Sequence, residues 1–261
     1  MRRRDHDSAS VRLSKALSWL LRHGAEKEGF QFLPGGFLYV DHILQKPQFS
    51  KFTAEDVQSV VASNDKQRFH LETESETGRL KIRANQGHTL QVADLDLEPI
   101  TSAEQYPVVV HGTYFKFWES IRRQGLKRMK RTHVHFAAGE PGETGVISGM
   151  RGSCDLMIYL DLEKALADGL KFFRSANNVI LTEGNQDGAV PPDFFMKVIN
   201  RKTGKEISID RELGSLGGPT DGTDLPLPES GASSVSVTAD DLADEMDSKR
   251  KQRRKKKNPQ N

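Results

Sequence analysis

Hydrophobic residues in the first third of the chain recur at helical spacing and then at strand-like spacing. Five of them follow Ser10 on one face of a helix, which predicts an amphipathic helix with Ser10 as its N-cap. They are Val11, Leu13, Leu17, Leu20 and Leu21. Residues 36–44, GFLYVDHIL, predict a short strand that turns into a helix, and Thr53 predicts the start of another amphipathic helix that runs past Val61.

Apolar and polar positions alternate in the next stretch of sequence. Residues 68–74, RFHLETE, and 79–85, RLKIRAN, predict two strands joined by a turn, which makes a hairpin. Three helices and a two-stranded hairpin are the arrangement of a winged helix-turn-helix, a common nucleic-acid-binding module. Many winged helices contact only protein, so the pattern predicts a winged-helix lobe over residues 10–92 without identifying its partner.

The pattern changes to short apolar strands with few helices from about Leu97 onward. One clear helix is predicted over residues 115–124, FKFWESIRRQ, ending at Gly125. The strand candidates are residues 107–113, 132–138, 155–162, 177–184 and 194–200. They do not alternate regularly with helices, which disfavours a doubly wound parallel sheet. We therefore expect an α+β protein whose second lobe, residues 97–210, is β-rich and mixed or antiparallel.

Charge is segregated at the end of the chain, although the formal net charge of the whole is only +2. Residues 211–245 hold eight acids against one arginine, and residues 246–261 hold eight Lys or Arg against one acid. Large apolar side chains are nearly absent from both, so residues 211–261 are expected to be disordered. The terminal KRKQRRKKK reads either as a nuclear-import or phosphate-attracting signal or as a plain solvated tail.

Several classes of protein are disfavoured by what the sequence does not contain. Apolar runs are far shorter than the roughly 20 residues of a membrane span, and no apolar segment follows the first arginines as in a secretory signal. A single cysteine, Cys154, makes no internal disulfide. We therefore expect no membrane association and a cytoplasmic or nuclear location. Neither a dinucleotide-binding G-x-G-x-x-G nor a P-loop occurs.

Cationic side chains in the first lobe are the first candidates for chemistry. Arg22 and His23 come at the end of the first predicted helix, just before Gly24, although cations also favour this position through the helix dipole alone. On the second hairpin strand, Lys81, Arg83 and Asn85 would share one face. Two cations and an amide suit phosphate or carboxylate, while an exposed hairpin face often has the same composition.

The β-rich lobe adds a second set of candidates. His111, Gly112 and Thr113 follow directly on an apolar strand, where loops commonly carry function. His133 and His135 alternate along another strand, but no nearby carboxylate or cysteine completes a metal-ligand set, so we expect no metal. Arg151 precedes the most apolar strand, where its plain interpretation is a surface arginine.

In combination these segments resemble the RNA 2′-phosphotransferases, often called tRNA 2′-phosphotransferases, across nearly all of residues 11–200. The resemblance is carried by linked motifs in the same order. They are LSKALSWLLRHG (13–24), IRANQGH (82–88), HGTYFKFWESIRRQGLKRMKRTHVHFA (111–137), the arginine ahead of LMIYLDL (156–162), FFRSANNVIL (172–181) and VPPDFF (190–195).

This resemblance implies a winged-helix lobe that holds RNA and an ADP-ribosyltransferase-like lobe that holds NAD. It implies that an internal 2′-phosphate attacks the nicotinamide ribose, and that the resulting ADP-ribosylated phosphate then gives 2′-OH RNA and ADP-ribose 1″,2″-cyclic phosphate. The family's catalytic set carries over to Arg22, His23, Arg83 and Arg151. NAD-binding positions carry over to His111, Gly112, Thr113, Arg131 and His133. The implied partner is a 2′-phosphorylated RNA, with tRNA expected, bound by a monomer.

Arginines suit such a reaction on physical grounds, because a phosphate dianion is already a nucleophile and needs cationic positioning more than a general base. Two other interpretations remain open at this point. A purely nucleic-acid-binding protein would explain the first lobe and the basic tail but would leave the second lobe's histidine motifs without a purpose. An ADP-ribosyltransferase acting on protein or on terminal RNA phosphates would fit the second lobe equally well.

Overall fold

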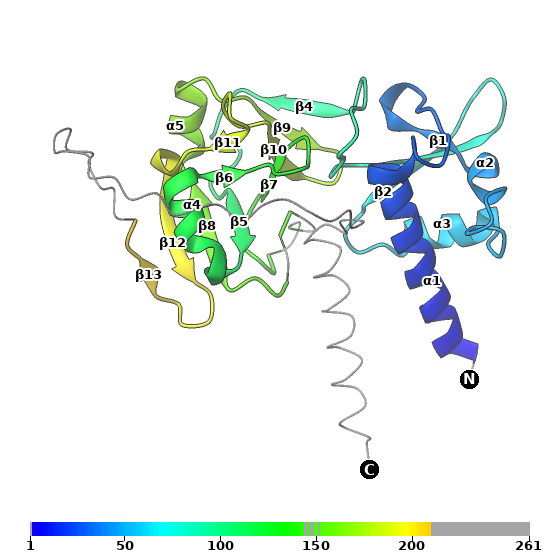
Figure 1. Cartoon of the computed structure of the whole chain (residues 1–261), viewed down its shortest axis with the longest axis horizontal. Coiled ribbons are helices and arrows are strands. Elements are labelled where there is room, and N and C mark those ends of the chain that lie inside the picture. Colours follow the sequence, from blue (N-terminus) through cyan, green and yellow to red (C-terminus); the bar gives the residue numbers. More distant parts are fainter. Residues whose placement is uncertain (1, 144–145, 147–148, 151, 210–261) are drawn as a thin grey trace, which may run out of the picture. The chain divides into compact units, whose positions relative to one another are not determined.

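The computed structural model describes residues 2–143, 146, 149–150 and 152–209 (Figure 1). Its N-terminal part combines three α-helices with a small sheet. The elements are α1 (Arg2–Trp19), the π-helical turn η1 (Leu20–Gly24), the 3₁₀ turn η2 (Pro34–Gly36), β1 (Leu38–Tyr39), α2 (Val40–Leu44), α3 (Ala54–Ala62), β2 (Phe69–Thr73) and β3 (Leu80–Ala84). Strand β3 lies in the middle of this sheet and pairs antiparallel with both β1 and β2.

A hydrophobic core of its own holds this N-terminal part together. The predicted helix face supplies the fully buried Leu13, Leu17, Leu20 and Leu21, and the sheet supplies Ile82. Burying one such side chain stabilises the fold by about 1.5–3 kcal/mol, so the leucine spacing of α1 fixes which side of that helix faces the core. The opposite side of α1 remains exposed.

Most sequence expectations for this part are confirmed, and two are wrong. Val11 is not on the buried face with the leucines, because it is 50% exposed. Thr53 begins α3 through a capping box, in which its hydroxyl accepts from the Asp56 N–H and the Asp56 carboxylate accepts from the Thr53 N–H. The predicted hairpin and the strand-to-helix turn at 38–44 are present. Ser10 is not an N-cap, however, because α1 already begins at Arg2. No proline or glycine lies between Arg2 and Ser10 to stop the helix from continuing.

The C-terminal part is built on one antiparallel sheet of eight strands in the described residues, ordered β13-β12-β8-β5-β7-β10-β9-β4. The strands are β4 (Leu97–Ile100), β5 (Val110–Thr113), β7 (Val134–Ala137), β8 (Leu156–Leu160), β9 (Phe172–Ser175), β10 (Val179–Thr182), β12 (Phe195–Asn200) and β13 (Glu206–Ile207). A separate short pair is formed by β6 (Leu126–Lys127) and β11 (Ala189–Val190). The remaining elements are the 3₁₀ turns η3 (Phe115–Phe117) and η4 (Pro192–Phe194) and the helices α4 (Trp118–Gln124) and α5 (Leu162–Ala167).

All five strands predicted in this part are present, and the sheet confirms the mixed helix-and-sheet class. The helix predicted over 115–124 is only partly right, because its first turn is the 3₁₀ turn η3 and the α-helix begins at Trp118. Strands β4, β6, β9, β11 and β13 and helix α5 were not predicted. Each is six residues or shorter, and a pattern that short carries little periodicity to detect.

Strands β5 and β7 lie side by side in the middle of the sheet, and their pairing brings His111 near His135. A core that includes Phe136, Ile158, Phe172 and Ile180 packs under them. The predicted disordered tail, 211–261, lies outside the described residues. Within the part that is described, no helix combines the length and the apolarity that a membrane crossing requires.

Gly125 ends α4 and returns the chain to β6, with φ +75° and ψ −178°. Only glycine adopts this conformation readily, and a Cβ at Gly125 would collide with the Val190 carbonyl. We expect Gly125→Ala to lower the free energy of unfolding by about 2–4 kcal/mol. The matched control Gly169→Ala, also at positive φ but with open space around it, should lose only about 1–2 kcal/mol. Equal losses in urea denaturation would show that the Val190 contact has no effect.

Candidate active site

Arg22 and His23 lie on the π-helical turn η1, which follows α1 without a break. Such turns are rare and occur frequently at functional sites. The Arg22 carbonyl accepts hydrogen bonds from the Thr89 backbone N–H at 3.0 Å and from the Thr89 hydroxyl at 3.3 Å. The same hydroxyl lies 3.1 Å from His23 Nδ1. Thr89 therefore fixes both predicted residues from a segment far along the chain.

Gly87 lies directly against the side chain of Arg22. Its φ is +90°, and a Cβ built there would lie 3.3 Å from Arg22 Nε and 3.4 Å from Cζ. The absence of a side chain at Gly87 lets the guanidinium pack against the backbone of the 86–88 segment. The Arg22 side chain therefore packs against the backbone at Gly87.

Arg83 is only 4% exposed, although it comes from a hairpin strand. Its guanidinium donates to the Asp96 carboxylate at 2.8 Å. The same guanidinium lies 5.2 Å from the centre of the Phe37 ring, and Lys81 Nζ lies 4.8 Å from the centre of that ring. Lys81 and Arg83 therefore share a face, as predicted. Asn85 is also buried and donates to the Gln67 carbonyl at 2.7 Å. The face is enclosed, which argues against a simple solvated hairpin surface.

His88 is a member of the site that the sequence analysis did not single out. It is 2% exposed, and burial lowers its pKa to about 3, with four positively charged or chargeable neighbours adding to the effect. Those neighbours are, in order of effect, Arg22, His23, His133 and Arg83. His88 is thus a neutral ring surrounded by the predicted catalytic residues. The signal that could have found it is the run of polar residues, 85–88, directly after a strand.

Thr132 joins the first set of candidates to the second. Its backbone N–H and its hydroxyl both donate to the His88 carbonyl, at 3.0 and 3.3 Å. Next in the chain comes His133, whose Nδ1 lies 2.9 Å from the Thr132 hydroxyl and whose ring meets Phe173 edge-on. Burial lowers the pKa of His133.

His135 is buried beside these residues, and its pKa lies well below the ordinary value. Burial is the main cause, and nearby positive charge adds to it, from Arg131, His133, Arg22 and His111 in that order. The arginine from η1 and the histidine from β5 therefore act on the same imidazole. Residues predicted in both lobes are brought together around His88 and His135.

His111, Gly112 and Thr113 form most of strand β5 rather than a loop after it. His111 Nδ1 donates to the His135 carbonyl at 2.7 Å, so Nδ1 carries the hydrogen. A Cβ at Gly112 would collide with Met150 and Cys154, so the space beside Gly112 is filled by side chains of the protein itself.

A cavity of about 320 Å³ lies next to Thr132, with Arg128, Glu183 and Asn185 in its walls.

The site contains several buried polar atoms that have no hydrogen-bond partner among the described residues. They are Arg83 Nε, Asn85 Oδ1, both ring nitrogens of His88, and His135 Nε2. Leaving such an atom unsatisfied costs about 1–3 kcal/mol, so their clustering indicates a site built for a polar ligand. Arg83 Nε and one ring nitrogen of the neutral His88 are donors, and the positive charge of the arginines nearby favours an anion. The described residues contain no group of three or more metal-ligating side chains, and Arg151 lies outside them.

Comparison with known proteins gives the chain its family. The RNA 2′-phosphotransferase, Tpt1/KptA family matches residues 8–184, about two thirds of the sequence. The chain belongs to this family. Arg22, His23, Arg83 and His88 all fall within the matched part, as do the five candidates of the second set, from His111 to His133.

Named relatives cover most of the chain. A zebrafish (Danio rerio) protein named tRNA 2′-phosphotransferase 1 is 55% identical over 74% of this chain and 87% of its own length. The human protein of the same name is 50% identical over 80% of this chain and 82% of its own length. The tRNA 2′-phosphotransferase of Saccharomyces cerevisiae is 38% identical over 74% and 85%, respectively.

Gly87 provides a test of how closely Arg22 must be held. Gly87→Ala places a methyl group against the guanidinium of Arg22, which is predicted to be catalytic. Small displacements of such a group are costly, so the catalytic efficiency with a 2′-phosphorylated RNA should fall at least about tenfold. Gly78→Ala is the matched control, with φ +69° and nothing near its Cβ. Both variants should lose similar stability, and only Gly87→Ala should lose activity. Equal activities would contradict the packing role.

His88 should make folding sensitive to acid. Its folded pKa of about 3 lies below the ordinary 6.5, so the unfolded chain binds one more proton between these values, and stability falls as the pH falls through this window. His88→Gln removes that proton, and its unfolding free energy should depend less on pH, by up to about 1.4 kcal/mol per pH unit. Urea denaturation across this range measures the slope, with His42→Gln, at an exposed position of α2, as the control. Parallel slopes for wild type and His88→Gln would contradict the assignment.

Proposed function

We propose that this protein removes a 2′-phosphate from RNA and transfers it to NAD, with spliced tRNA as the physiological substrate. The single observation that carries the proposal is the enclosed pair of Arg83 and His88 beside Arg22, because the polar atoms of Arg83 and His88 that lack a partner in the described residues suit a phosphate dianion. Membership of the RNA 2′-phosphotransferase family supports the same reaction. The tRNA substrate is supported by the names of the zebrafish, human and yeast relatives.

The arginines bind the 2′-phosphate and hold it in the orientation needed for attack. Each guanidinium presents a planar fork of donors that stays protonated, and burial strengthens its contact with an oxyanion. Arg83 is held ready by Asp96, and Arg22 by Gly87 and Thr89. Because the phosphate is already a nucleophile, this step needs no carboxylate general base. Arg151 completes the catalytic set in this proposal.

His23 and His88 divide the proton chemistry. His23 contacts the Thr89 hydroxyl and is partly accessible, which suits a group that exchanges a proton with the substrate. His88 stays neutral and donates a hydrogen bond to the bound anion. Phosphate bound beside His88 offsets the positive charge of Arg22 and Arg83 and raises the pKa of His88 from its ligand-free value.

Residues 97–210 form the NAD-binding, ADP-ribosyltransferase-like lobe in this proposal, and residues 10–92 the winged-helix lobe that holds RNA. His111, Gly112, Thr113, Arg131 and His133 hold NAD. Two observations fit that role, namely the unsatisfied Nε2 of the buried His135 and the fixed tautomer of His111 beside it. When bound, NAD supplies an electrophilic ribose carbon with nicotinamide as leaving group. The protein acts as a monomer in the cytoplasm or nucleus.

The reaction itself is tested by incubating the full chain with NAD and a short RNA that carries one internal 2′-phosphate, followed by mass analysis. We expect RNA with a free 2′-OH, together with nicotinamide and ADP-ribose cyclic phosphate. RNA that keeps its phosphate and gains the mass of ADP-ribose would instead mean a transferase of RNA phosphates that stops after the first step. RNA binding without any effect of NAD would mean a nucleic-acid-binding module.

Arginine substitutions test which side chains hold the phosphate. A charge-assisted contact is worth about 1.5–3 kcal/mol, so Arg22→Ala, Arg83→Ala and Arg151→Ala should each lower turnover by about 10- to 100-fold or more. The matched control is Arg79→Ala. Arg79 directly precedes strand β3, which carries Arg83, but its guanidinium forms an ion pair with Asp41 at the surface. Wild-type turnover in any of the three site variants removes that residue from the catalytic set.

A further inference from the structure

The exposed side of α1 combines cationic side chains with a large aromatic one. Between Ser8 and Ala25 the chain contains no Asp or Glu. Arg12 and Lys15 lie on the helix away from the core, and Trp19 is 40% exposed, unusually high for so large an apolar side chain. These three residues are spaced by three and four positions, so they lie along one side of the helix, opposite the buried leucines.

Trp19 is held in a defined position. A Cβ at Gly24 would lie 2.5 Å from the Trp19 ring, so the indole lies over the Gly24 backbone at the end of η1. One side of the ring is therefore supported by the protein, while the exposed fraction is available to a partner. An aromatic ring fixed in this way is a platform on which a nucleobase can stack.

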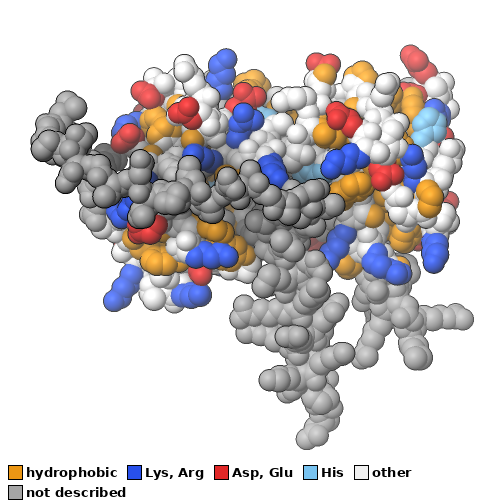
Figure 2. All heavy atoms as spheres, in the orientation of Figure 1, with side chains coloured by type: hydrophobic (Ala, Val, Ile, Leu, Met, Phe, Trp, Pro, Cys, Tyr) orange, Lys and Arg blue, Asp and Glu red, His pale blue; other side chains and the backbone are white. Residues whose placement is uncertain are grey.

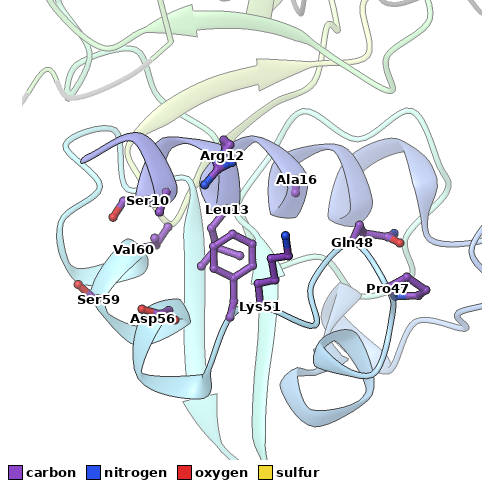
Figure 3. A pocket seen from close by; sticks show the side chains of 12 residues that line it. Ser10, Arg12, Leu13, Ala16, Pro47, Gln48, Lys51, Asp56, Ser59 and Val60 are labelled. Atoms are coloured by element: carbon purple, nitrogen blue, oxygen red, sulfur yellow. The ribbon is translucent and has the colours of Figure 1, made fainter. Parts of the chain in front are cut away.

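Cationic side chains continue from α1 across a neighbouring hollow. A cavity of about 480 Å³ is lined by residues of α1, α3 and the 47–52 segment, and Figure 3 shows Arg12 on its α1 side and Lys51 extending toward α1. The one carboxylate in its wall, Asp56, is engaged in the α3 capping box. Figure 2 shows blue Lys and Arg side chains over the α1 region as well as elsewhere on the same face.

We infer that Arg12, Lys15, Trp19 and Lys51 form a docking face for the single-stranded RNA that flanks the 2′-phosphate. This inference rests on the proposed function, and the continuity of the face with Arg22 and His23 favours RNA over other anionic partners. From Arg12 to His23 is about 16 Å along the helix, enough for roughly five stacked nucleotides. The cations contact the backbone phosphates of the strand, and Trp19 stacks on a base next to the reacting nucleotide.

Binding of a fluorescent single-stranded RNA that spans the face tests the stacking contact. Trp19→Ala should weaken binding by about tenfold to a hundredfold without changing its salt dependence. Trp19→Phe, which keeps a ring, should restore most of the affinity. Thermal melting identifies any variant that is unfolded. Equal binding by Trp19→Ala and wild type, or no rescue by Phe, would overturn the stacking role.

The cations have a different signature. Arg12→Ala/Lys15→Ala should reduce the slope of log affinity against log salt by about 1.4, because each contact with a single strand contributes about 0.7. The matched control, Lys171→Ala/Lys205→Ala, removes two exposed cations from the C-terminal part and should leave the slope unchanged. Binding of the face to anionic vesicles or to an acidic peptide as tightly as to RNA would overturn the assignment to RNA.

Substrate length separates this inference from the proposed function. The catalytic efficiency for a spanning RNA, divided by that for a minimal 2′-phosphorylated dinucleotide, should fall at least about tenfold in Arg12→Ala/Lys15→Ala and in Trp19→Ala. An unchanged ratio overturns the docking face while leaving the reaction intact. Failure of the wild-type protein to process either substrate would instead overturn the proposed function.

Discussion

The candidate site buries polar side-chain atoms that have no hydrogen-bond partner in the described residues, and the rest of the fold must compensate for the energetic cost of burying them. Arg83 and His88 are almost fully enclosed, and several of their polar atoms are satisfied by nothing in the described residues. The cost of that arrangement is met elsewhere, by two separate hydrophobic cores. In the proposed function these polar atoms gain a partner when the phosphate binds, which is electrostatic preorganisation for phosphoryl chemistry.

Two threonines hold the site together. Thr89 fixes the π-helical turn that carries Arg22, and Thr132 donates twice to the His88 carbonyl from a distant segment of the chain. Backbone contacts of this kind fix the segments that carry Arg22 and His88. Gly87 has a related effect, because its missing side chain is the space that Arg22 occupies.

Elements marked by helical spacing or by a run of apolar residues could be predicted from the sequence, and several short elements without such a pattern could not. The leucines of α1 and the capping box at Thr53 were predictable because spacing and capping chemistry act locally. The start of α1 and the 3₁₀ turn before Trp118 depend on weaker signals. Arg22, Arg83 and His111 could be selected as candidates by residue type and place. His88 and the roles of Thr89 and Thr132 could not, because they exist only through contacts between distant segments.

The central claim is that His88 is a buried neutral imidazole among cations, and that it gains a hydrogen-bond partner when the 2′-phosphate binds. Its most direct test is the titration of the His88 imidazole by NMR, with and without a 2′-phosphorylated RNA. Our account predicts a pKa near 3 in the free protein and a clear rise when the 2′-phosphate is bound, larger than with the same RNA lacking that phosphate. A free-protein pKa near the ordinary 6.5, or a pKa that both RNAs shift equally, would contradict it.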